Sequence, residues 1–564
     1  MILLRELHFI TESTECTVCS SKLRAYKTKR RNVRSADMGC YVAVEHMRQC
    51  ENGHPRIVFR SEKLKNIVNG HCTYANDVMV PAATMRFIDG RSCSEIARAL
   101  DIGISERHVR RLSNTALEVF ARIHEKSSDK LKQLLPGWVL QIDGTVDGEY
   151  DMIVSVRDAV SGFVLHARTC HFESEASIET VLNDIKSRFG TPAASMSDMR
   201  RGILAAMEKV FPGVHIGLCK FHFLRDLGSD IMEYRHTVLG KTLRRLGTKS
   251  ALKRALQSLP AYDTKLLREV GEDYCSDGAG LARMIARHML EELVDTGESS
   301  GRGFPFSLRH LEFVTDCLSS LPSLREMDAV ANDASIAQAM AALELLAADA
   351  LAMRLTGELT GINGVFCKLR IAMYPKHGGT PLSDEPKRTN GEMKEDCETV
   401  IGTLDVYMKT SIPPYMLEAA KHIVGQYRKW KSHLFVSELD GIAHTNNSLE
   451  RVFRKVRRNV RRRCGDMATG HQLTLNGERL LLFQNISNRK YIAAVFGNDD
   501  IASVLGRERS LLPKTVAMTH RKRAELLEKG RRMLLSGNVP VTVYTDKLWD
   551  DAQSTRQTQA AQHD

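Results

Sequence analysis

Three carboxylates stand at positions where acidic side chains are uncommon. Asp143 ends the apolar run "VLQIDGT", and Asp198 follows a second short apolar run in "SMSDMRRG". Glu450 heads an arginine-rich segment predicted to be a helix. A strand committed to burial rarely ends in a carboxylate unless the acid has a partner. Three converging carboxylates can hold two Mg²⁺ or Mn²⁺ ions about 4 Å apart, which stabilise the attacking and leaving oxygens of a phosphoryl displacement.

Each acid also has an interpretation that involves no metal. An aspartate at a strand end is often a turn or N-cap residue. Glu450 could pair with Arg454 one helical turn later, which stabilises a solvated helix by only a few tenths of a kcal/mol. Because two aspartates on neighbouring predicted strands precede a third acid on a basic helix, we favour Asp143, Asp198 and Glu450 as catalytic metal ligands.

Residues 1–70 contain two pairs of possible zinc ligands. Cys16 and Cys19 are separated by two residues, and Cys50 and His54 by three. Tetrahedral Zn²⁺ binds such thiolate and imidazole sets, and the ion then stabilises a segment that has little core of its own. Unrelated cysteines remain the alternative, and four further residues compete as ligands: Cys40, His46, His71 and Cys72.

The chain is basic, with a net charge of +12 and an isoelectric point near 9.0. The excess is clustered in residues 22–34 and 451–463, which indicates a polyanionic partner. Residues 92–112 favour a helix-turn-helix, with an ordinary helical hairpin as the alternative. The predicted DNA-binding residues are Lys29, Arg30, Arg31, Arg107, Arg110, Arg111, Arg454, Arg457, Arg458 and Arg461.

The 564 residues include 13 cysteines, several of them isolated in apolar surroundings. This usage fits a reducing compartment better than a disulfide framework. The N-terminus lacks the apolar run of a signal peptide, and no window reaches the length of a membrane span. We therefore expect a cytoplasmic protein, associated with the nucleoid in a bacterial host.

The elements that must position the acids follow a recognisable order. Three short apolar runs from residue 138, separated by turn residues, predict an antiparallel meander. Alternating helices and strands follow, which is the order of a ribonuclease H-like core, and helix-forming windows dominate from 226. The predicted class is multidomain α+β. Its parts are a zinc ribbon at 1–70, a helix-turn-helix at 75–130, the first part of the core at 136–225, a helical insertion at 226–435, the second part of the core at 436–486 and a basic helical tail with a disordered end at 487–564.

Three stretches, taken in order, resemble a known family. "QIDGT", "SDMRRGILAAMEKVFPGVHIGLCKFHFLRDL" and "TNNSLERVFRKVRR" are similar to the DDE transposases of the Mutator-like and related bacterial insertion-sequence type. The resemblance spans about residues 138–485. It implies that Asp143, Asp198 and Glu450 are the metal ligands, and that Cys219 and His222 support the site as a C-x₂-H pair.

The resemblance also implies an activity and partners. The protein would bind the inverted repeats at the ends of a mobile element, cleave there with Mg²⁺ and join the freed end to target DNA, as a homodimer or larger assembly. Two alternatives stay open. One is a ribonuclease H-like nuclease acting on structured nucleic acid, and the other is a non-catalytic DNA-binding regulator derived from a transposase.

Overall fold

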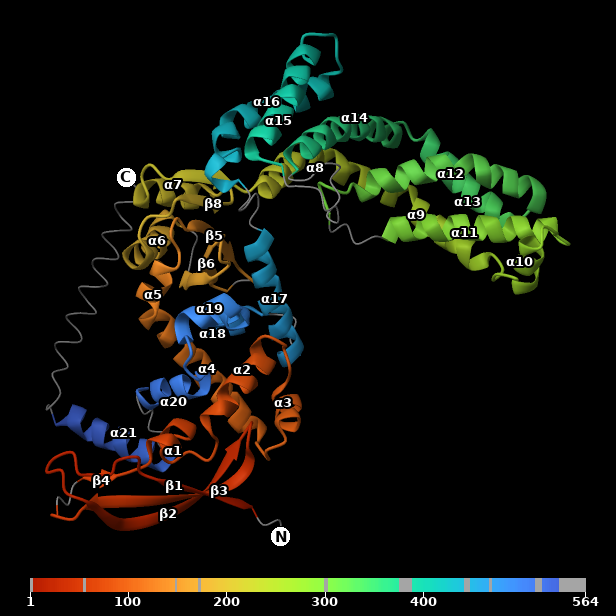
Figure 1. The fold of residues 1–564 in the computed structure, drawn as a ribbon. Coiled ribbons are helices and arrows are strands. Elements are labelled where there is room, and N and C mark those ends of the chain that lie inside the picture. The colour runs from red at the N-terminus through yellow and green to blue at the C-terminus, as the bar shows by residue number, and fades with distance from the viewer. Residues whose placement is uncertain are drawn as a thin grey trace. The chain divides into compact units, whose positions relative to one another are not determined.

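The computed structural model describes residues 4–53, 57–147, 150–170, 174–298, 303–374, 388–440, 447–465, 469–512 and 520–536. It confirms the α+β class, with many helices and two mixed sheets (Figure 1). The chain divides into a large unit, residues 1–508, and a small one, residues 509–564. Helix α21 (His520–Leu535) belongs to the small unit.

The first sheet has the strand order β1-β3-β2. Strand β4 pairs with Arg48 and Gln49 of β3, beyond the stretch of β3 that pairs with β1. β1 is parallel to β3, whereas β2 and β4 are antiparallel to it. Gly39, with a φ of +71°, makes the tight turn between the two long strands possible. The strands are β1 (Arg5–Ile10), β2 (Leu23–Ser35), β3 (Gly39–Cys50) and β4 (Val58–Phe59).

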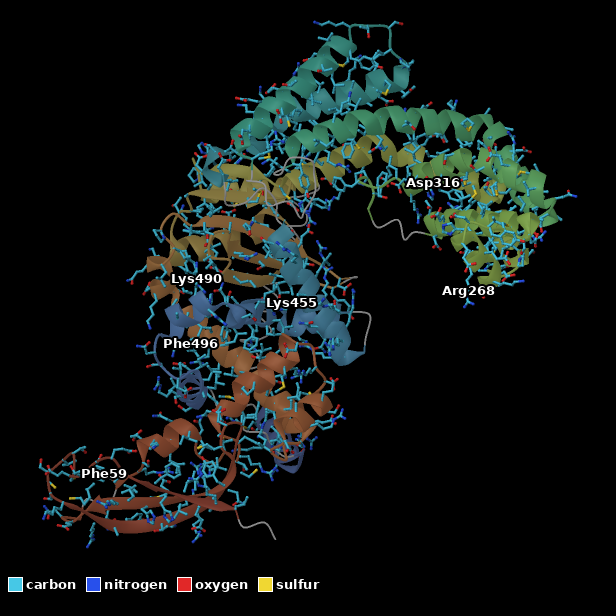
Figure 2. All side chains as sticks on the ribbon, turned by 45° about the vertical axis from the view of Figure 1, so that its right-hand side comes forward. Phe59, Arg268, Asp316, Lys455, Lys490 and Phe496 are labelled. Carbon is cyan, nitrogen blue, oxygen red and sulfur yellow. The ribbon has the colours of Figure 1, made fainter. Side chains whose placement is uncertain are left out.

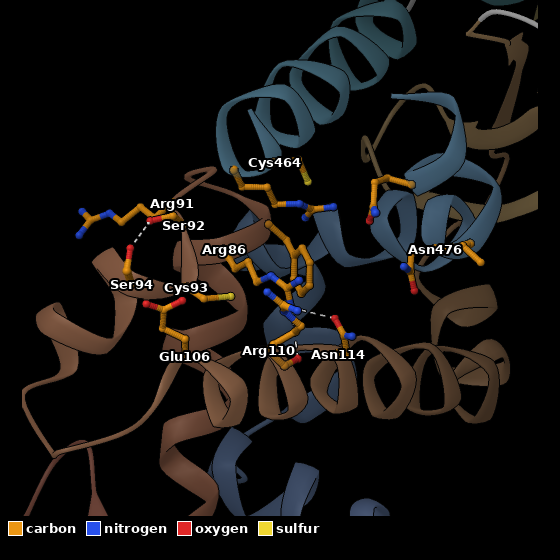
Figure 3. Close-up of a pocket in the computed structure, with 14 residues that line it drawn as sticks. Arg86, Arg91, Ser92, Cys93, Ser94, Glu106, Arg110, Asn114, Cys464 and Asn476 are labelled. Atoms are coloured by element: carbon orange, nitrogen blue, oxygen red, sulfur yellow. Dashed lines mark hydrogen bonds between the residues drawn. The ribbon is translucent and has the colours of Figure 1, made fainter. Parts of the chain in front are cut away.

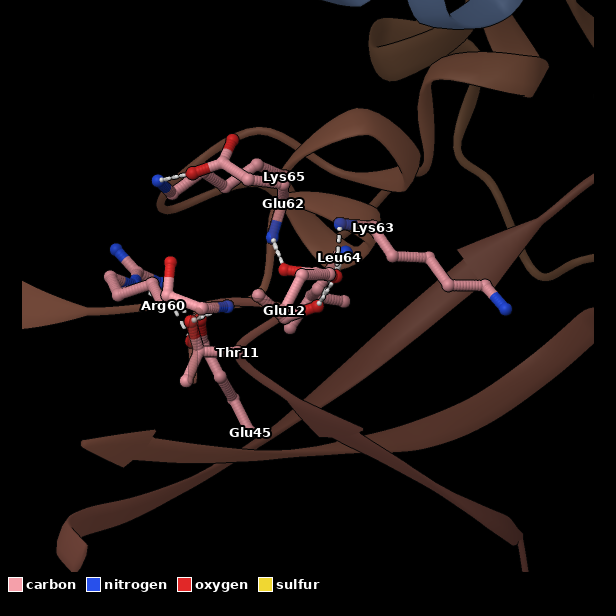
Figure 4. Close-up of polar contacts among 10 residues, drawn as sticks. Thr11, Glu12, Glu45, Arg60, Glu62, Lys63, Leu64 and Lys65 are labelled. Atoms are coloured by element: carbon pink, nitrogen blue, oxygen red, sulfur yellow. Dashed lines mark hydrogen bonds and ion pairs between the residues drawn. The ribbon is translucent and has the colours of Figure 1, made fainter. Parts of the chain in front are cut away.

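Two acidic side chains attach helix α1 (Glu62–Ile67) to this sheet (Figure 4). The Glu12 carboxylate accepts hydrogen bonds from the first backbone N–H groups of α1, at 2.7 and 3.0 Å. Although partial burial alone would raise the pKa of Glu12, these hydrogen bonds lower it to about 2. Glu45 is buried and accepts two hydrogen bonds from the Arg60 guanidinium, at 2.7 and 3.0 Å. The charge buried in the sheet is therefore paired.

A group of helices follows the first sheet. Ser92 and Glu95 form a capping box at the start of α3, and Asp101 ends that helix in the left-handed conformation, with a φ of +46°. Ser105 occupies the predicted N-cap position of α4. The helices are α2 (Met79–Phe87), α3 (Cys93–Leu100), α4 (Glu106–Lys126) and α5 (Ser128–Gln133).

The second sheet has the strand order β7-β6-β5-β8-β9. Its first three strands form an antiparallel meander, and β8 and β9 are parallel to β5. Helices α6 (Glu175–Phe189) and α7 (Arg201–Val210) make the crossovers. The strands are β5 (Val139–Thr145), β6 (Met152–Asp158), β7 (Val164–Cys170), β8 (Ala194–Ser197) and β9 (His215–Leu218).

The chain then runs through a series of helices, and all of them except α10 contribute residues to one continuous apolar core, from Leu218 to Leu434. Trp430 packs against this core. The helices are α8 (Lys220–Leu246), α9 (Thr248–Ser258), α10 (Thr264–Gly271), α11 (Gly278–Glu298), α12 (Arg309–Ala331), α13 (Ala334–Ala348), α14 (Ala350–Met373), α15 (Asn390–Tyr407) and α16 (Pro414–Leu434).

Among the described residues, no single helix is long and apolar enough to cross a membrane. The pair α13 and α14 passes the length and composition test together, with a bend of 70° between the two helices.

The chain returns to the second sheet after these helices. α17 (Asn447–Cys464) contacts β5 and α2, and α18 (Gly470–Phe483) packs on β6, β7 and α4. Gly477 permits the close approach of α18, because a Cβ there would lie 1.9 Å from the Ile153 side chain. Helices α19 (Arg489–Phe496) and α20 (Ile501–Ser510) follow.

A fully buried histidine connects α4 to the second sheet and to α19. His124 Nε2 lies 2.9 Å from the Leu165 carbonyl oxygen, and Nδ1 lies 2.8 Å from the Tyr491 hydroxyl. Because the carbonyl can only accept, Nε2 carries the proton and Nδ1 accepts from Tyr491. Burial lowers the pKa of His124 to about 4, so the neutral ring is the form that the fold holds.

We predict that protonation of His124 destabilises the large unit in acid. The folded-state pKa lies below the ordinary value of 6.5, so the stabilising contribution is complete above pH 6.5 and falls as the pH drops toward about 4. The full loss is on the order of 3 kcal/mol. Urea unfolding of the wild type and of His124→Gln between pH 7.5 and 4.5 tests this. Identical pH dependence in the two proteins would contradict it.

Candidate active site and nucleic-acid interface

The parallel pairing of β5 with β8 brings two of the predicted acids to the same edge of the second sheet. Val139 pairs with Ala194 and Gln141 with Met196, a constant offset along the two strands. The same offset sets Asp143 opposite Asp198, where the strands reach their carboxyl ends. Both side chains are about 5% exposed.

These aspartates share a low-dielectric environment with few donors. The Gly144 N–H donates to Asp143 Oδ1 at 2.8 Å, and Asp198 lies 3.0 Å from Arg200 Nε. Burial, with the nearby Asp198 charge, raises the pKa of Asp143 to about 7, and burial also raises the pKa of Asp198. Two buried carboxylates with raised pKa values form a site that a cation would stabilise.

Glu450 reaches this edge from α17. Ser448 Oγ donates to Gln141 Oε1 at 3.0 Å, which fixes the start of the helix on β5. An apolar stripe buries the inner face of the helix, and Glu450 is half-buried beside it. The stripe consists of Leu449, Phe453, Val456 and Val460.

His222, in the first turn of α8, is the partner of Glu450. Its Nε2 lies 3.1 Å from Glu450 Oε1, and both the imidazole and Cys219 are buried. Burial alone would lower the pKa of His222, but the neighbouring Cys219 thiol and Glu450 carboxylate raise it to about 10. The hydrogen bond with His222 in turn lowers the pKa of Glu450. The sequence pointed to Cys219 and His222 as supporting residues, but gave no sign of this contact.

The donor chemistry of the three acids fits oxygen-ligated divalent cations. Among the residues that the structure describes, the acids do not form a group whose ligand atoms all lie within 4.8 Å of one another. Glu450 is held by His222 and, at 2.9 Å, by Arg454. Asp143 and Asp198 would be the first ligands of a divalent cation, and Glu450 would join them after leaving one of its present partners.

The basic residues of α17, the helix on which Figure 2 labels Lys455, differ in their surroundings. Arg457 donates to the Val146 carbonyl at 3.0 Å, and Arg454 contacts Glu450. Arg458 and Arg461 are exposed. The helix therefore presents guanidinium groups next to the buried carboxylates.

The N-terminal basic residues have different surroundings. Lys29 is exposed on β2, and Arg30 pairs with Glu6. Arg31 instead binds the Val68 and Asn69 carbonyls after α1, at 3.2 and 3.1 Å, so it helps to hold that helix in place.

Three predicted DNA-binding residues lie in the first turns of α4, and all three are exposed: Arg107, Arg110 and Arg111. They leave a positive surface on this helix, as the helix-turn-helix interpretation requires.

Three of the four predicted zinc ligands converge. The sulfur atoms of Cys16, Cys19 and Cys50 all lie within 4.8 Å of one another, with Cys19 and Cys50 at 3.4 Å. A tetrahedral Zn²⁺ with bonds of about 2.3 Å would separate its sulfur ligands by about 3.8 Å, so the cluster fits. Hydrogen bonds with Ser21 lower the pKa of Cys19 to about 6. His54 lies outside the described residues.

Three of the four competing ligands, Cys40, His46 and Cys72, are engaged elsewhere. The Cys40 thiol contacts the Ile102 carbonyl at 3.7 Å, and His46 stacks on His8 with ring centroids 5.2 Å apart. Cys72 packs against the small core of the first sheet. In the described part of the chain, the three converging thiols are the one group that meets the distance criterion for a metal site.

No protein-family model matches the chain, and no curated protein matches it. One similar solved structure is the Drosophila P element transposase strand transfer complex, at 10% sequence identity and a TM-score of 0.33. The match covers 75% of this chain and 94% of that one.

Proposed function

We propose that the protein is a DDE transposase, a metal-dependent phosphoryl transferase acting on DNA, with a ribonuclease H-like core. The observation that carries the proposal is the register of β5 and β8, which sets Asp143 opposite Asp198, with Glu450 reaching the same edge on α17. The strand order, with a three-stranded meander and two added parallel strands, is the order expected of that core.

The site residues have distinct roles in this proposal. Asp143 and Asp198 would hold both divalent ions, and Glu450 would complete the second site. Bound Mg²⁺ supplies Lewis acidity and a water that is readily deprotonated. His222 orients the Glu450 carboxylate through Nε2, and Arg454 engages its other oxygen. No covalent link between the enzyme and DNA is needed, because the freed 3′-hydroxyl is itself the next nucleophile.

DNA would be held by surfaces around this edge. Exposed Arg458 and Arg461 lie on the helix that carries Glu450, and backbone phosphates approaching them would pass next to the acids. The sheet with the thiol cluster and the basic start of α4 would recognise the ends of the element. Pairing of two ends calls for a homodimer or a larger assembly.

Strand transfer distinguishes this function from its alternatives. We expect the protein, with Mg²⁺, to join linear duplexes carrying the sequences that flank its gene to a supercoiled plasmid. Sequencing of the joints should show a target duplication of constant length. Cleavage without joining would favour a nuclease, and sequence-specific binding without cleavage would favour a regulator.

The contact between His222 and Glu450 leads to a separate prediction. His222→Ala should lower cleavage by about 10- to 100-fold and raise the Mg²⁺ concentration needed for half-maximal activity, because a residue that orients a metal ligand contributes about that much. His222→Gln, which keeps an N–H donor, should recover part of the loss. His433→Ala serves as the control, since His433 contacts the Ile216 carbonyl away from the acids. An unchanged Mg²⁺ dependence in His222→Ala would exclude the orienting role.

A further inference from the structure

A cavity of about 540 Å³ lies where α2, α3 and α4 meet α17 and α18 (Figure 3). It is separate from the acidic site and from the thiol cluster. Among the described residues, four arginines line it, whereas Glu106 is the one acidic lining residue. The arginines are Arg86, Arg91, Arg110 and Arg463. Such an excess of positive charge around a hollow calls for an anion.

Two of these guanidiniums are packed over one buried ring. Arg86 lies 5.0 Å and Arg463 4.8 Å from the centre of the Phe87 ring, which is 3% exposed. Burial lowers the pKa of Arg86 to about 10, and it lowers that of Arg463 as well. The neighbouring arginines contribute to the shift of Arg86. Holding like charges together in this way is costly in the absence of a counter-charge.

The protein supplies little compensation for this charge. Arg86 Nη1 donates to Ser113 Oγ at 2.7 Å, to Asn114 Oδ1 at 2.9 Å and to the Arg110 carbonyl at 3.2 Å, all of them neutral acceptors. The buried Nε of Arg463 has no hydrogen-bond partner within the described chain. Neither guanidinium forms an ion pair with any acid that the structure describes. Donors are thus available for an oxyanion with several acceptor atoms.

We propose that this cavity binds a phosphate group, held by Arg86 and Arg463 with help from Arg110. Given the proposed function, the phosphate belongs to the backbone of bound DNA. Amide side chains at the rim, Asn114 and Asn476, offer further donors to its oxygens and to the adjoining sugar. Such a contact fixes the position of DNA between the α3–α4 helices and α17 and does not depend on base sequence.

The exposed thiol of Cys464, on the cavity wall, provides a direct test. Alkylation of the full-length protein by iodoacetamide is followed by mass spectrometry without added divalent metal. A 30-base-pair duplex of unrelated sequence should slow alkylation of Cys464 about tenfold when present at about ten times its Kd. Cys275, exposed in the connection between α10 and α11, is the internal control and should react at an unchanged rate.

Salt dependence of DNA binding gives a second measurement. Arg463→Gln should reduce the slope of log K against log [salt] by about one, the value for a single lost phosphate contact. Arg325→Gln, which removes an exposed arginine paired with Glu344, should leave the slope unchanged. If Arg463→Gln does not fold, the protection of wild-type Cys464 still decides the outcome.

In a separate experiment, inorganic phosphate replaces DNA and alkylation of Cys464 is measured again. Protection of Cys464 by phosphate and by DNA supports the assignment, whereas protection by phosphate alone overturns its DNA part and points to a free phosphate compound. Protection by neither overturns the proposal. These outcomes do not depend on the proposed catalysis. If the wild-type protein fails to transfer strands while DNA still protects Cys464, the transposase function is disproved and the phosphate site stands.

Discussion

If the proposed function is correct, Asp143→Asn should abolish DNA cleavage and strand transfer, with a loss on the order of a thousandfold or more, because an amide is a poor ligand for a divalent cation. Asp198→Asn, across the β5–β8 pairing, should have the same effect. DNA binding at low salt should stay near the wild-type level, since neither side chain is expected to contact phosphate directly. Gel-based cleavage and joining assays with Mg²⁺ measure the effect.

Asp143→Asn is also expected to stabilise the protein in the absence of divalent metal. The folded-state pKa of Asp143, about 7, lies above the ordinary value of 3.8, so the ionised carboxylate opposes folding at pH 8. An asparagine removes this cost, and its Oδ1 can still accept from the Gly144 N–H. We expect a gain of about 2–4 kcal/mol in the free energy of unfolding.

The control for both effects is Asp184→Asn. Asp184 is half-exposed on α6 and pairs with Arg168 at 2.8 Å. Its replacement should change stability by no more than about 1 kcal/mol and leave cleavage intact. Normal cleavage by both Asp143→Asn and Asp198→Asn would rule out the metal assignment. Lowered metal-free stability of Asp143→Asn would contradict the electrostatic account.

Removal of zinc is expected to unfold the first sheet, where Cys50 ends β3 and Cys16 and Cys19 lie in the connection between β1 and β2. The purified protein should contain about one Zn²⁺ per chain, and Cys50→Ser should lose most of it, since the apparent binding free energy of such sites is about 10–16 kcal/mol and depends on every thiolate. Binding to the element ends should fall with it. Metal analysis, together with circular dichroism before and after chelation, provides the measurement.

Cysteines outside the cluster provide the matched controls. Cys40→Ser should retain zinc, because the Cys40 thiol faces the Ile102 carbonyl. His54→Ala tests the fourth ligand that the sequence predicts. Full zinc content in Cys50→Ser would disprove the site, whereas full content in His54→Ala would disprove only that ligand.

Local pattern was sufficient to predict several elements. The turn residues between short apolar runs predict the β5–β6–β7 meander, and the spacing of Leu449, Phe453, Val456 and Val460 is that of one buried helix face, as α17 has it. The basic run at 22–34 was interpreted only as a charged surface, although most of it forms strand β2. Charged residues hide a strand when its side chains are exposed on both faces, as from Arg24 to Arg30.

Contacts between residues far apart in the sequence are harder to predict from local sequence pattern. Asp143 and Asp198 could be proposed as neighbours because parallel strands end at a common edge. The contact of His222 with Glu450 depends on the path of the chain through α8–α16, which no local pattern encodes. The arginine cavity was missed for a similar reason, since Arg86 and Arg463 are far apart in sequence and each resembles an ordinary surface residue.

The helical segment between β9 and α17 is closed at its base. His433, near the end of α16, contacts the Ile216 carbonyl of β9 at 3.0 Å, and a Cβ on Gly217 would lie 2.2 Å from Leu439. This closure has a kinetic consequence. Without it, joining Asp198 to Glu450 would mean ordering a loop of about 250 residues, whereas prior folding of the helices reduces the search to short connections. A nascent chain should therefore complete the helical segment before it gains Glu450, so that, on the proposed function, no chain shorter than 450 residues carries all three acids.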